Sequence, residues 1–176
     1  MIWFLSGLAW LAGSLVLMAL IEYLIHRYPM HNGRFVRKTG IGTDVLEAHS
    51  VLHHGRYYKG EAFENNPDPA APRISMKIEK EFNLVGLAPI WLTLCLFVSV
   101  LGGVIFAMVT VAQATVWTMV HREMHVPTGR WFSRTRYYRY LRAWHYTHHV
   151  HPGTNFAAVF PPFFDWLFGT YRKPLV

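Results

Sequence analysis

Residues 2–25 read IWFLSGLAWLAGSLVLMALIEYLI, an apolar run in which Glu22 is the one charged side chain. A helix rises ~1.5 Å per residue, so this run is long enough to cross a hydrocarbon core of ~30 Å. A cleaved signal peptide is the alternative, but it needs a basic start and a small-residue cleavage site, and neither is obvious here. The run therefore predicts an uncleaved membrane-spanning helix.

A second apolar run, residues 84–120, carries no charged side chain. As one helix it would extend over roughly 55 Å, which is too long for a single crossing. Gly102 and Gly103 divide the run, and glycine pairs commonly form turns. We therefore expect two antiparallel helices, over residues 84–101 and 104–120. Both are short for spans, so a re-entrant hairpin is the alternative.

The composition and the placement of charge agree with a membrane protein. Hydrophobic residues make up 52% and charged residues 15% of the 176-residue chain, which excludes disorder and argues against a soluble domain. The net charge of +7 first suggests a nucleic-acid partner. However, every Lys and Arg lies in one of two blocks, 27–80 and 122–173, and the apolar runs have none. This positive-inside pattern places both blocks on the cytosolic side and disfavours nucleic acid.

The segments between and after the spans have less regular patterns. Residues 55–72 predict a loop, residues 75–81 a short amphipathic lead-in, and residues 156–168 an apolar segment that packs at the interface. Residues 131–144 interleave aromatic side chains with Arg134, Arg136, Arg139 and Arg142. This suits a helix in the headgroup layer, whose arginines hold a lipid headgroup, dock an acidic electron donor, or serve only as solvated orientation charge.

Histidine is the outlier of the composition, with 11 residues. Ten of them lie in four tight groups: His26 and His31; His49, His53 and His54; His121 and His125; His145, His148 and His149. Residues three or four apart share a face of an α-helix, which predicts that His121 and His125 point the same way. The same spacing relates His49 to His53, and His145 to His148 or His149. Adjacent histidines diverge by ~100°, so each adjacent pair can serve two sides of a site.

Imidazole is a common ligand of Zn, Fe, Cu and Ni, and one tetrahedral ion takes four ligands. Ten candidates therefore predict two ions with about five histidines each. A surface histidine patch with adventitious metal is the alternative. A metalloprotease is disfavoured, because Glu123 comes two residues after His121 and not directly after it. Cys95 is the single cysteine, which excludes an intramolecular disulfide. We expect its side chain to pack as a small, buried apolar group.

Three further residues are expected to contact the metal-binding histidines without binding the metal themselves: Glu22, His151 and Asn155. Glu22 lies four residues before His26, so its carboxylate either accepts the His26 N–H or pairs with an Arg or Tyr at the membrane edge. For Asp165 we expect a helix cap or an Arg pair.

The four histidine groups, in this order, resemble the histidine boxes of the fatty acid hydroxylase/sterol desaturase superfamily. The flanks match as well: Glu22-Tyr23 before the first group, Asn155-Phe156 after the last, and DWLFGTY at residues 165–171. The resemblance covers most of residues 22–172. It implies an integral-membrane enzyme whose histidines hold two metal ions, normally non-haem iron, on the cytosolic side. Electrons would come from a separate ferredoxin- or cytochrome b5-like donor, because no such domain is fused to the chain.

These observations predict an all-α integral membrane protein with three to four transmembrane or re-entrant helices and a cytosolic histidine-rich cap. Residues 1–176 form a single domain, with spans over 2–25, 84–101 and 104–120 and histidine-rich segments over 26–81 and 121–176. The function that the resemblance implies is O2-dependent hydroxylation or desaturation of a lipid C–H bond, on a fatty acyl chain or a sterol-like lipid. A carotenoid ring hydroxylase is the alternative within the same chemistry, and purified protein can carry zinc in place of iron.

Two other classes of protein remain as alternatives. A non-enzymatic zinc-binding or metal-transport protein is the first, although transport predicts ligands near the membrane midplane, where the runs have almost none. A bis-histidine haem protein is the second, and it needs only two or four of the histidines.

Overall fold

The computed structural model describes residues 2–60, 62–71 and 75–175, and all regular structure in these residues is helical. Helix α1 (Ile2–Ile25) continues without a break into the π-helical segment η1 (His26–Met30). Helix α6 spans Val100–His125. The continuous helix Trp3–Met30 and α6 are each long and apolar enough to cross a membrane. Large apolar side chains such as Phe4 and Met108 are exposed along them, as expected for surfaces that face lipid.

A third apolar element is bent. It consists of α4 (Lys80–Gly86), α5 (Ala88–Thr93) and the π-helical segment η4 (Leu94–Val98), with a bend of 51° after α4. Counted as one span, it brings the number of candidate spans to three. The predicted lead-in over 75–81 is not a helix as a whole, because α4 begins only at Lys80.

The turn between the second and third apolar elements was predicted at the wrong place. It lies at Ser99, whose extended backbone separates η4 from α6 and whose hydroxyl accepts the N–H of Gly102 at 3.1 Å. Gly102 and Gly103 lie inside the first turn of α6. A Cβ on Gly102 would lie 2.7 Å from the Trp10 ring, and one on Gly103 would lie 2.7 Å from the Trp91 carbonyl oxygen. The two glycines therefore permit close helix packing and do not form the turn.

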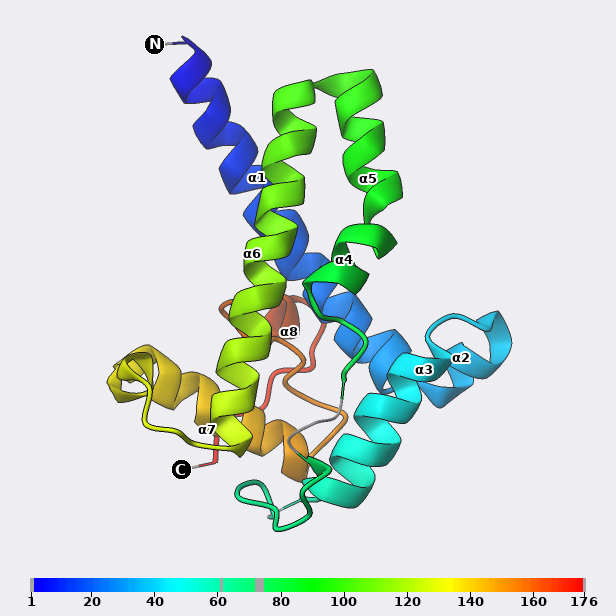
Figure 1. The fold of residues 1–176 in the computed structure, drawn as a ribbon, viewed down its shortest axis with the longest axis vertical. Helices are drawn as coiled ribbons and strands as arrows, with labels where there is room; N and C mark the ends of the chain where they lie inside the picture. Colours follow the sequence, from blue (N-terminus) through cyan, green and yellow to red (C-terminus); the bar gives the residue numbers. More distant parts are fainter. Residues whose placement is uncertain (1, 61, 72–74, 176) are drawn as a thin grey trace.

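The remaining helices form a cap below the spans (Figure 1). They are listed in chain order: α2 (Gly33–Thr39), α3 (Thr43–Leu46), the π-helical segment η2 (Glu47–Tyr57), the 3-10 segment η5 (Trp131–Arg134), α7 (Arg136–Val150) and α8 (Phe163–Leu167). Figure 1 shows the N-terminus and the α5–α6 turn at one end of the molecule, α7 toward the other end, and α8 at mid-height between them. This is the sidedness that the charge pattern predicts.

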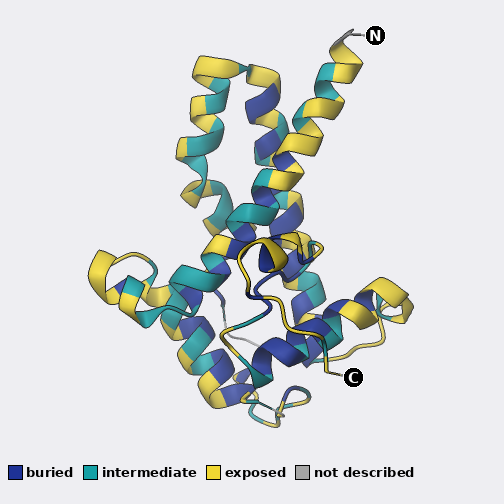
Figure 2. Cartoon of the chain, turned by 180° about the vertical axis from the view of Figure 1, so that it is seen from behind, coloured by how far each residue is buried: buried dark blue, intermediate teal, exposed yellow. Residues whose placement is uncertain are grey.

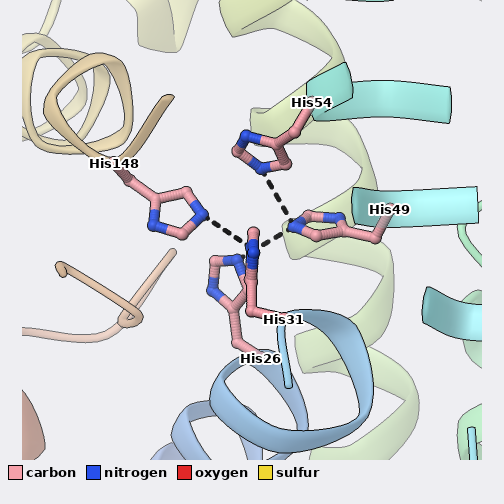
Figure 3. Close-up of side chains that lie close together, drawn as sticks. All are labelled: His26, His31, His49, His54 and His148. Carbon is pink, nitrogen blue, oxygen red and sulfur yellow. Dashed lines mark hydrogen bonds between the residues drawn. The ribbon is translucent and has the colours of Figure 1, made fainter. Parts of the chain in front are cut away.

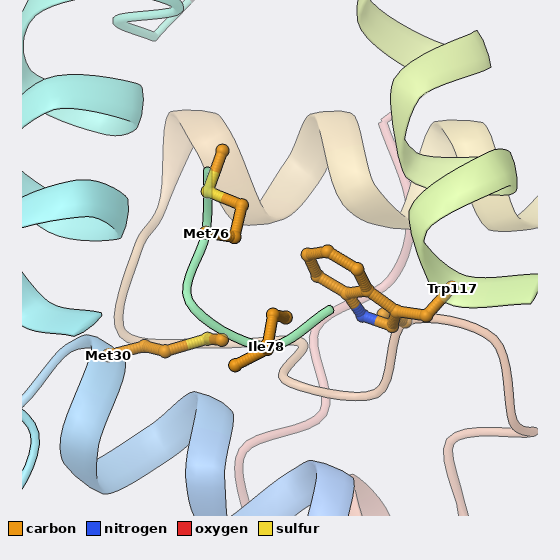
Figure 4. Close-up of a cluster of buried hydrophobic side chains, with 5 residues drawn as sticks. Met30, Met76, Ile78 and Trp117 are labelled. Atoms are coloured by element: carbon orange, nitrogen blue, oxygen red, sulfur yellow. The ribbon is translucent and has the colours of Figure 1, made fainter. Parts of the chain in front are cut away.

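Burial is concentrated in the cap and where the cap meets the spans (Figure 2). Met18 on α1 packs against Phe106 and Val109 on α6, which joins the two long helices. Below them, Met30, Met76, Ile78 and Trp117 close the junction between the spans and the cap (Figure 4). This apolar layer separates the lipid-facing part of the molecule from the clustered polar side chains beneath it.

Candidate metal centre

Four separate parts of the chain bring their histidines into one buried cluster. They are η1 with the residue that follows it, η2, the last turns of α6, and the second half of α7. The ten clustered residues are those of the four sequence groups, and all are buried except His31, which is half-buried. The eleventh, His151, lies just past α7 and does not belong to the cluster.

The first group, called site 1 here, consists of His26, His31, His49, His54 and His148 (Figure 3). Their ligand atoms all lie within 4.8 Å of one another. The closest approaches are between Nε2 atoms: His148 to His31 at 2.9 Å and His26 to His49 at 3.0 Å. Imidazole nitrogen atoms from three segments of the chain, namely η1 with the residue after it, η2 and α7, thus lie close together.

The second group, called site 2, consists of His53, His121, His125 and His145, again with ligand atoms within 4.8 Å. His149 joins it, because its Nε2 lies 3.2 Å from the Nε2 atoms of both His53 and His145. The two sites adjoin, since the ring of His149 stacks on that of His54 at 3.9 Å between centroids. The ten histidines therefore form two neighbouring sites, and His149 also groups with His53 of site 2 and His54 of site 1.

The division within η2 differs from the α-helical prediction. His49 and His53 were expected on one face, but His49 lies in site 1 and His53 in site 2. The reason is that η2 is a π-helix, whose i→i+5 hydrogen bonds widen the turn and bring His54 toward the face of His49, with their Nε2 atoms 3.2 Å apart. The prediction for α6 holds, because that helix is regular and His121 and His125 both lie in site 2.

Backbone carbonyls orient four of the rings. Nδ1 of His26 lies 2.6 Å from the Phe156 carbonyl oxygen, and Nδ1 of His148 lies 2.7 Å from that of Thr154. In site 2, Nδ1 of His125 and Nδ1 of His149 each lie 2.7 Å from a carbonyl oxygen, of Phe63 and Tyr58 respectively. A carbonyl only accepts, so each Nδ1 carries the proton and each Nε2 keeps its lone pair. These partners could not be predicted from the sequence, because every residue has a backbone carbonyl group and no residue type marks the ones that accept here.

The donor set fits bound cations. The lone pairs on Nε2 of His26, His125, His148 and His149 all point at other imidazole nitrogens. If the facing rings donated an Nε2–H, their Nδ1 would become an acceptor, and the buried Nδ1 atoms of His49, His53 and His54 have no partner among the described residues. The buried Nε2 of His121 is also without one there. Metal ions would satisfy these lone pairs together.

The electrostatics of the cluster keep the rings neutral. Burial, followed by repulsion from neighbouring imidazoles, holds the pKa of seven histidines outside the spans well below the usual histidine value: His31, His49, His53, His54, His145, His148 and His149. Neutral imidazole is the form that binds a metal ion. The cluster therefore presents its ligands in the binding form at physiological pH.

Residues 154–159 carry two of the orienting carbonyls, and buried polar side chains hold this segment. Asn155 bonds the backbone of Arg172 through both side-chain atoms, at 2.8 and 3.0 Å. Asp165 accepts the N–H groups of Phe156 and Ala157, each at 2.8 Å. The predicted cap or Arg pair for Asp165 is thus wrong, because its carboxylate binds this loop backbone and the Thr170 hydroxyl.

Glu22 holds the same segment from the membrane side. Its carboxylate accepts the N–H of Ala158 at 2.7 Å and a hydrogen bond from the Gln113 amide. The predicted bond to His26 and the predicted Arg or Tyr pair are both absent among the described residues. Glu22 instead fixes the loop whose Phe156 carbonyl orients His26.

Other predicted residues lie outside the cluster. Glu123 accepts the backbone N–H groups of Thr128, Gly129 and Arg130, so it ties down the loop after α6 and does not face a histidine pair. Arg142 donates to Glu64 through Nε at 2.8 Å, which occupies it within the cap. Arg134, Arg136 and Arg139 are exposed.

A cavity of about 330 Å³ opens beside site 2 and was not predicted. His53, His121 and His125 form part of its wall, and Trp117 lines it while stacking on His121 at 4.4 Å between centroids. The rest of the wall combines apolar and polar side chains, among them Ala71, Met76, Val126, Tyr58, Thr118, Glu79 and Arg122. The size is within the range of small-molecule sites.

Apolar spans above a buried double cluster of neutral histidines define an integral membrane protein with a candidate metal centre. A family model described as fatty acid hydroxylase matches residues 11–170, which is most of the chain. The chain therefore belongs to the fatty acid hydroxylase family, a family of metal-dependent oxygenases. No curated protein and no solved structure matches it.

Proposed function

We propose that this protein hydroxylates or desaturates a C–H bond of a membrane lipid in an O2-dependent reaction at a pair of iron ions. The substrate is a fatty acyl chain or a sterol-like lipid. The observation that carries the proposal is the convergence of ten imidazoles in two adjoining groups beside a cavity, at one end of two membrane-spanning helices. Family membership supports the lipid and oxygenase parts of the proposal.

In this proposal site 1 and site 2 each hold one ion, and all ten ligands are neutral imidazoles. Bound iron would supply the oxidising power that attack on an unactivated C–H bond requires and that amino-acid side chains lack. The protein's own contribution is positioning. The carbonyls of Phe156, Thr154, Phe63 and Tyr58 set the tautomer and the plane of four rings, and such outer partners strongly affect metal affinity.

The cavity beside site 2 supports a lipid substrate. Trp117 and Met76 give part of its wall an apolar surface, and Trp117 belongs to α6, the candidate span that carries His121 and His125. Tyr58 and Thr118 also line it, and their hydroxyl groups can orient a polar group of the substrate. A lipid whose tail already lies in the bilayer can therefore bring a C–H bond to the histidine cluster.

The charge distribution supports a cytosolic position for the histidine cap. All Lys and Arg residues lie in the two blocks 27–80 and 122–173, which belong to the end of the molecule that carries the cluster. A reducing cytosol also suits a reaction that consumes electrons, which a separate carrier protein would deliver.

Lipid mass spectrometry of cells that express the protein tests this proposal. His148→Ala removes a residue of site 1, and His151→Ala is the matched control, because His151 is a histidine outside the cluster. We expect a lipid with one added oxygen atom, or with two hydrogens removed, in the wild type and the control but not in His148→Ala. Metal analysis should give about two ions per chain in the wild type. Unchanged lipids in several hosts, together with tightly bound zinc, would favour the zinc-binding alternative.

A further inference from the structure

The reaction proposed above needs electrons that this chain does not carry. Hydroxylation of R–H consumes one O2, two protons and two electrons and gives R–OH and one water, while desaturation consumes the same electrons and gives two waters. The sequence has one cysteine, Cys95, so it cannot provide the thiolates of an iron–sulfur cluster. In this inference both electrons come from a reduced carrier that binds at the surface of residues 1–176 and leaves oxidised.

We infer that an acidic one-electron carrier protein docks on the outer face of α7 together with the C-terminal segment 171–175. This surface, called the α7–tail face here, contains the exposed residues Arg136, Arg139, Tyr140, Tyr171, Arg172 and Lys173. The inference rests on the proposed function and identifies the partner and its contact surface.

Hydrogen bonds and ring contacts place the C-terminal segment on α7. The N–H of Leu175 donates to the Thr147 hydroxyl at 2.7 Å, and the Tyr171 ring lies 5.3 Å from that of Trp144. On α7, Tyr140 stacks on Trp144 at 6.0 Å between centroids and lies four residues after Arg136, on the same side of the helix. The two stretches therefore form one continuous surface.

The charge of this face suits an acidic partner. Residues 124–176 contain Asp165 as their one acidic residue, and its side chain is fully buried under hydrogen bonds from the loop. Arg142 is engaged by Glu64 and Arg130 pairs with Glu123 at 3.6 Å, so neither belongs to the face. Complementary charge steers such transient partners together.

The aromatic contacts connect this face to the part of α7 that carries cluster histidines. Tyr140 and Tyr171 are 36% and 40% exposed, and both touch Trp144, which is 1% exposed. Trp144 precedes His145 of site 2 and lies one helical turn before His148 of site 1. A carrier bound over the two tyrosines would thus lie against the buried ring of Trp144, on the helix that supplies His145 to site 2 and His148 to site 1. A lipid contact would explain the charge but not this arrangement.

The position of the face allows a soluble protein to reach it. The C-terminus and α7 lie at the end of the molecule opposite the N-terminus and the α5–α6 turn (Figure 1). The C-terminal segment is also exposed along most of its length (Figure 2). The face therefore lies at the end of the molecule that carries the histidine cluster.

The test measures binding of two probes, the soluble domain of a cytochrome b5 and a plant-type ferredoxin, to the metal-loaded protein in phosphatidylcholine nanodiscs. Arg136→Glu/Arg139→Glu reverses two charges of the face, and Arg37→Glu/Lys38→Glu on α2 reverses two exposed charges elsewhere. We expect at least one probe to bind, its affinity to fall at least about tenfold in the first variant at low salt, and the difference to shrink at high salt. The control variant should change affinity by less than about twofold.

A second variant, Tyr171→Leu, tests the aromatic connection. We expect slower reduction of the metal centre by the bound carrier and unchanged reduction by dithionite. Binding of neither probe, or equal loss in both charge variants, overturns the inference. If Arg136→Glu/Arg139→Glu loses binding to phosphatidylglycerol but binds the carrier as the wild type does, the face is a lipid contact. That result also overturns the inference. Binding needs no turnover, so carrier docking at this face without any modified lipid would contradict the proposed function alone.

Discussion

Asn155→Ala should lower the metal affinity of site 1 more than that of site 2, because of where this side chain lies. Asn155 stands between Thr154 and Phe156, whose carbonyls orient His148 and His26, both in site 1. Its side chain makes two hydrogen bonds to the Arg172 backbone, at 2.8 and 3.0 Å, and its φ is 58°. Each hydrogen bond contributes about 1 kcal/mol and a left-handed alanine costs about 1 kcal/mol, so we expect a loss of about 3 kcal/mol in unfolding free energy.

The assay is metal content at graded chelator concentrations, measured by mass spectrometry after gel filtration. Disturbing the outer hydrogen-bond partners of metal ligands typically lowers metal affinity by about 10–100-fold, and Asn155 positions two such carbonyls, so one ion should leave the variant at a lower chelator concentration than the other. Thr135→Ala is the control, because it removes the N-cap of α7, costs about 1 kcal/mol and touches no histidine. Simultaneous loss of both ions, or the wild-type profile, would refute this account of Asn155.

Three further predictions concern packing, the buried carboxylate of Glu123 in the last turn of α6, and pH. Gly103→Leu should abolish the folded peak in size-exclusion chromatography, since even a Cβ would lie 2.7 Å from the facing backbone, whereas Gly7→Leu has open space and should be neutral. Glu123→Gln should lower thermal stability by about 1 kcal/mol but retain the metal, because its partners are loop N–H groups; metal loss would contradict this. Metal-free protein should lose stability as pH falls below about 6.5, since unfolded histidines then bind protons that buried ones such as His53 and His148 do not. Each such histidine contributes about 1.4 kcal/mol per pH unit, and a flat denaturation curve between about pH 7 and 5.5 would contradict the buried neutral state.

The spans and the membership of the cluster could be predicted because hydropathy and histidine spacing are carried by residue types. The apolar run 2–25 became α1, and the ten grouped histidines converged. The turn could not be predicted, because Gly102 and Gly103 have the same identity whether they bend the chain or admit the Trp10 ring and the facing helix. Only the distance to a neighbouring helix separates the two uses of glycine, and a sequence does not contain that distance.

The assignment of histidines to sites depended on helix type, which sequence spacing does not reveal. A 3.6-residue repeat pairs His49 with His53, whereas the π-helix η2 pairs His49 with His54. Glu22 was misassigned for a related reason. Its sequence neighbour is His26, but its partners are Gln113 and the distant segment 158–159, because a buried carboxylate is bound by whichever donors the tertiary fold supplies.

The adjacent histidine pairs explain why the two sites adjoin. In η2, His54 belongs to site 1 and His53 to site 2; in α7, His148 belongs to site 1 and His149 contacts site 2. Consecutive Cα atoms are ~3.8 Å apart, so each pair fixes the spacing of the two sites through covalent geometry and not through packing alone. The spanning helices, in contrast, serve one site each, with His26 in site 1 and α6 in site 2. Movement of α1 against α6 would therefore shift His26 within site 1 or the α6 histidines within site 2. The histidine pairs of η2 and α7 would keep the distance between the two sites unchanged.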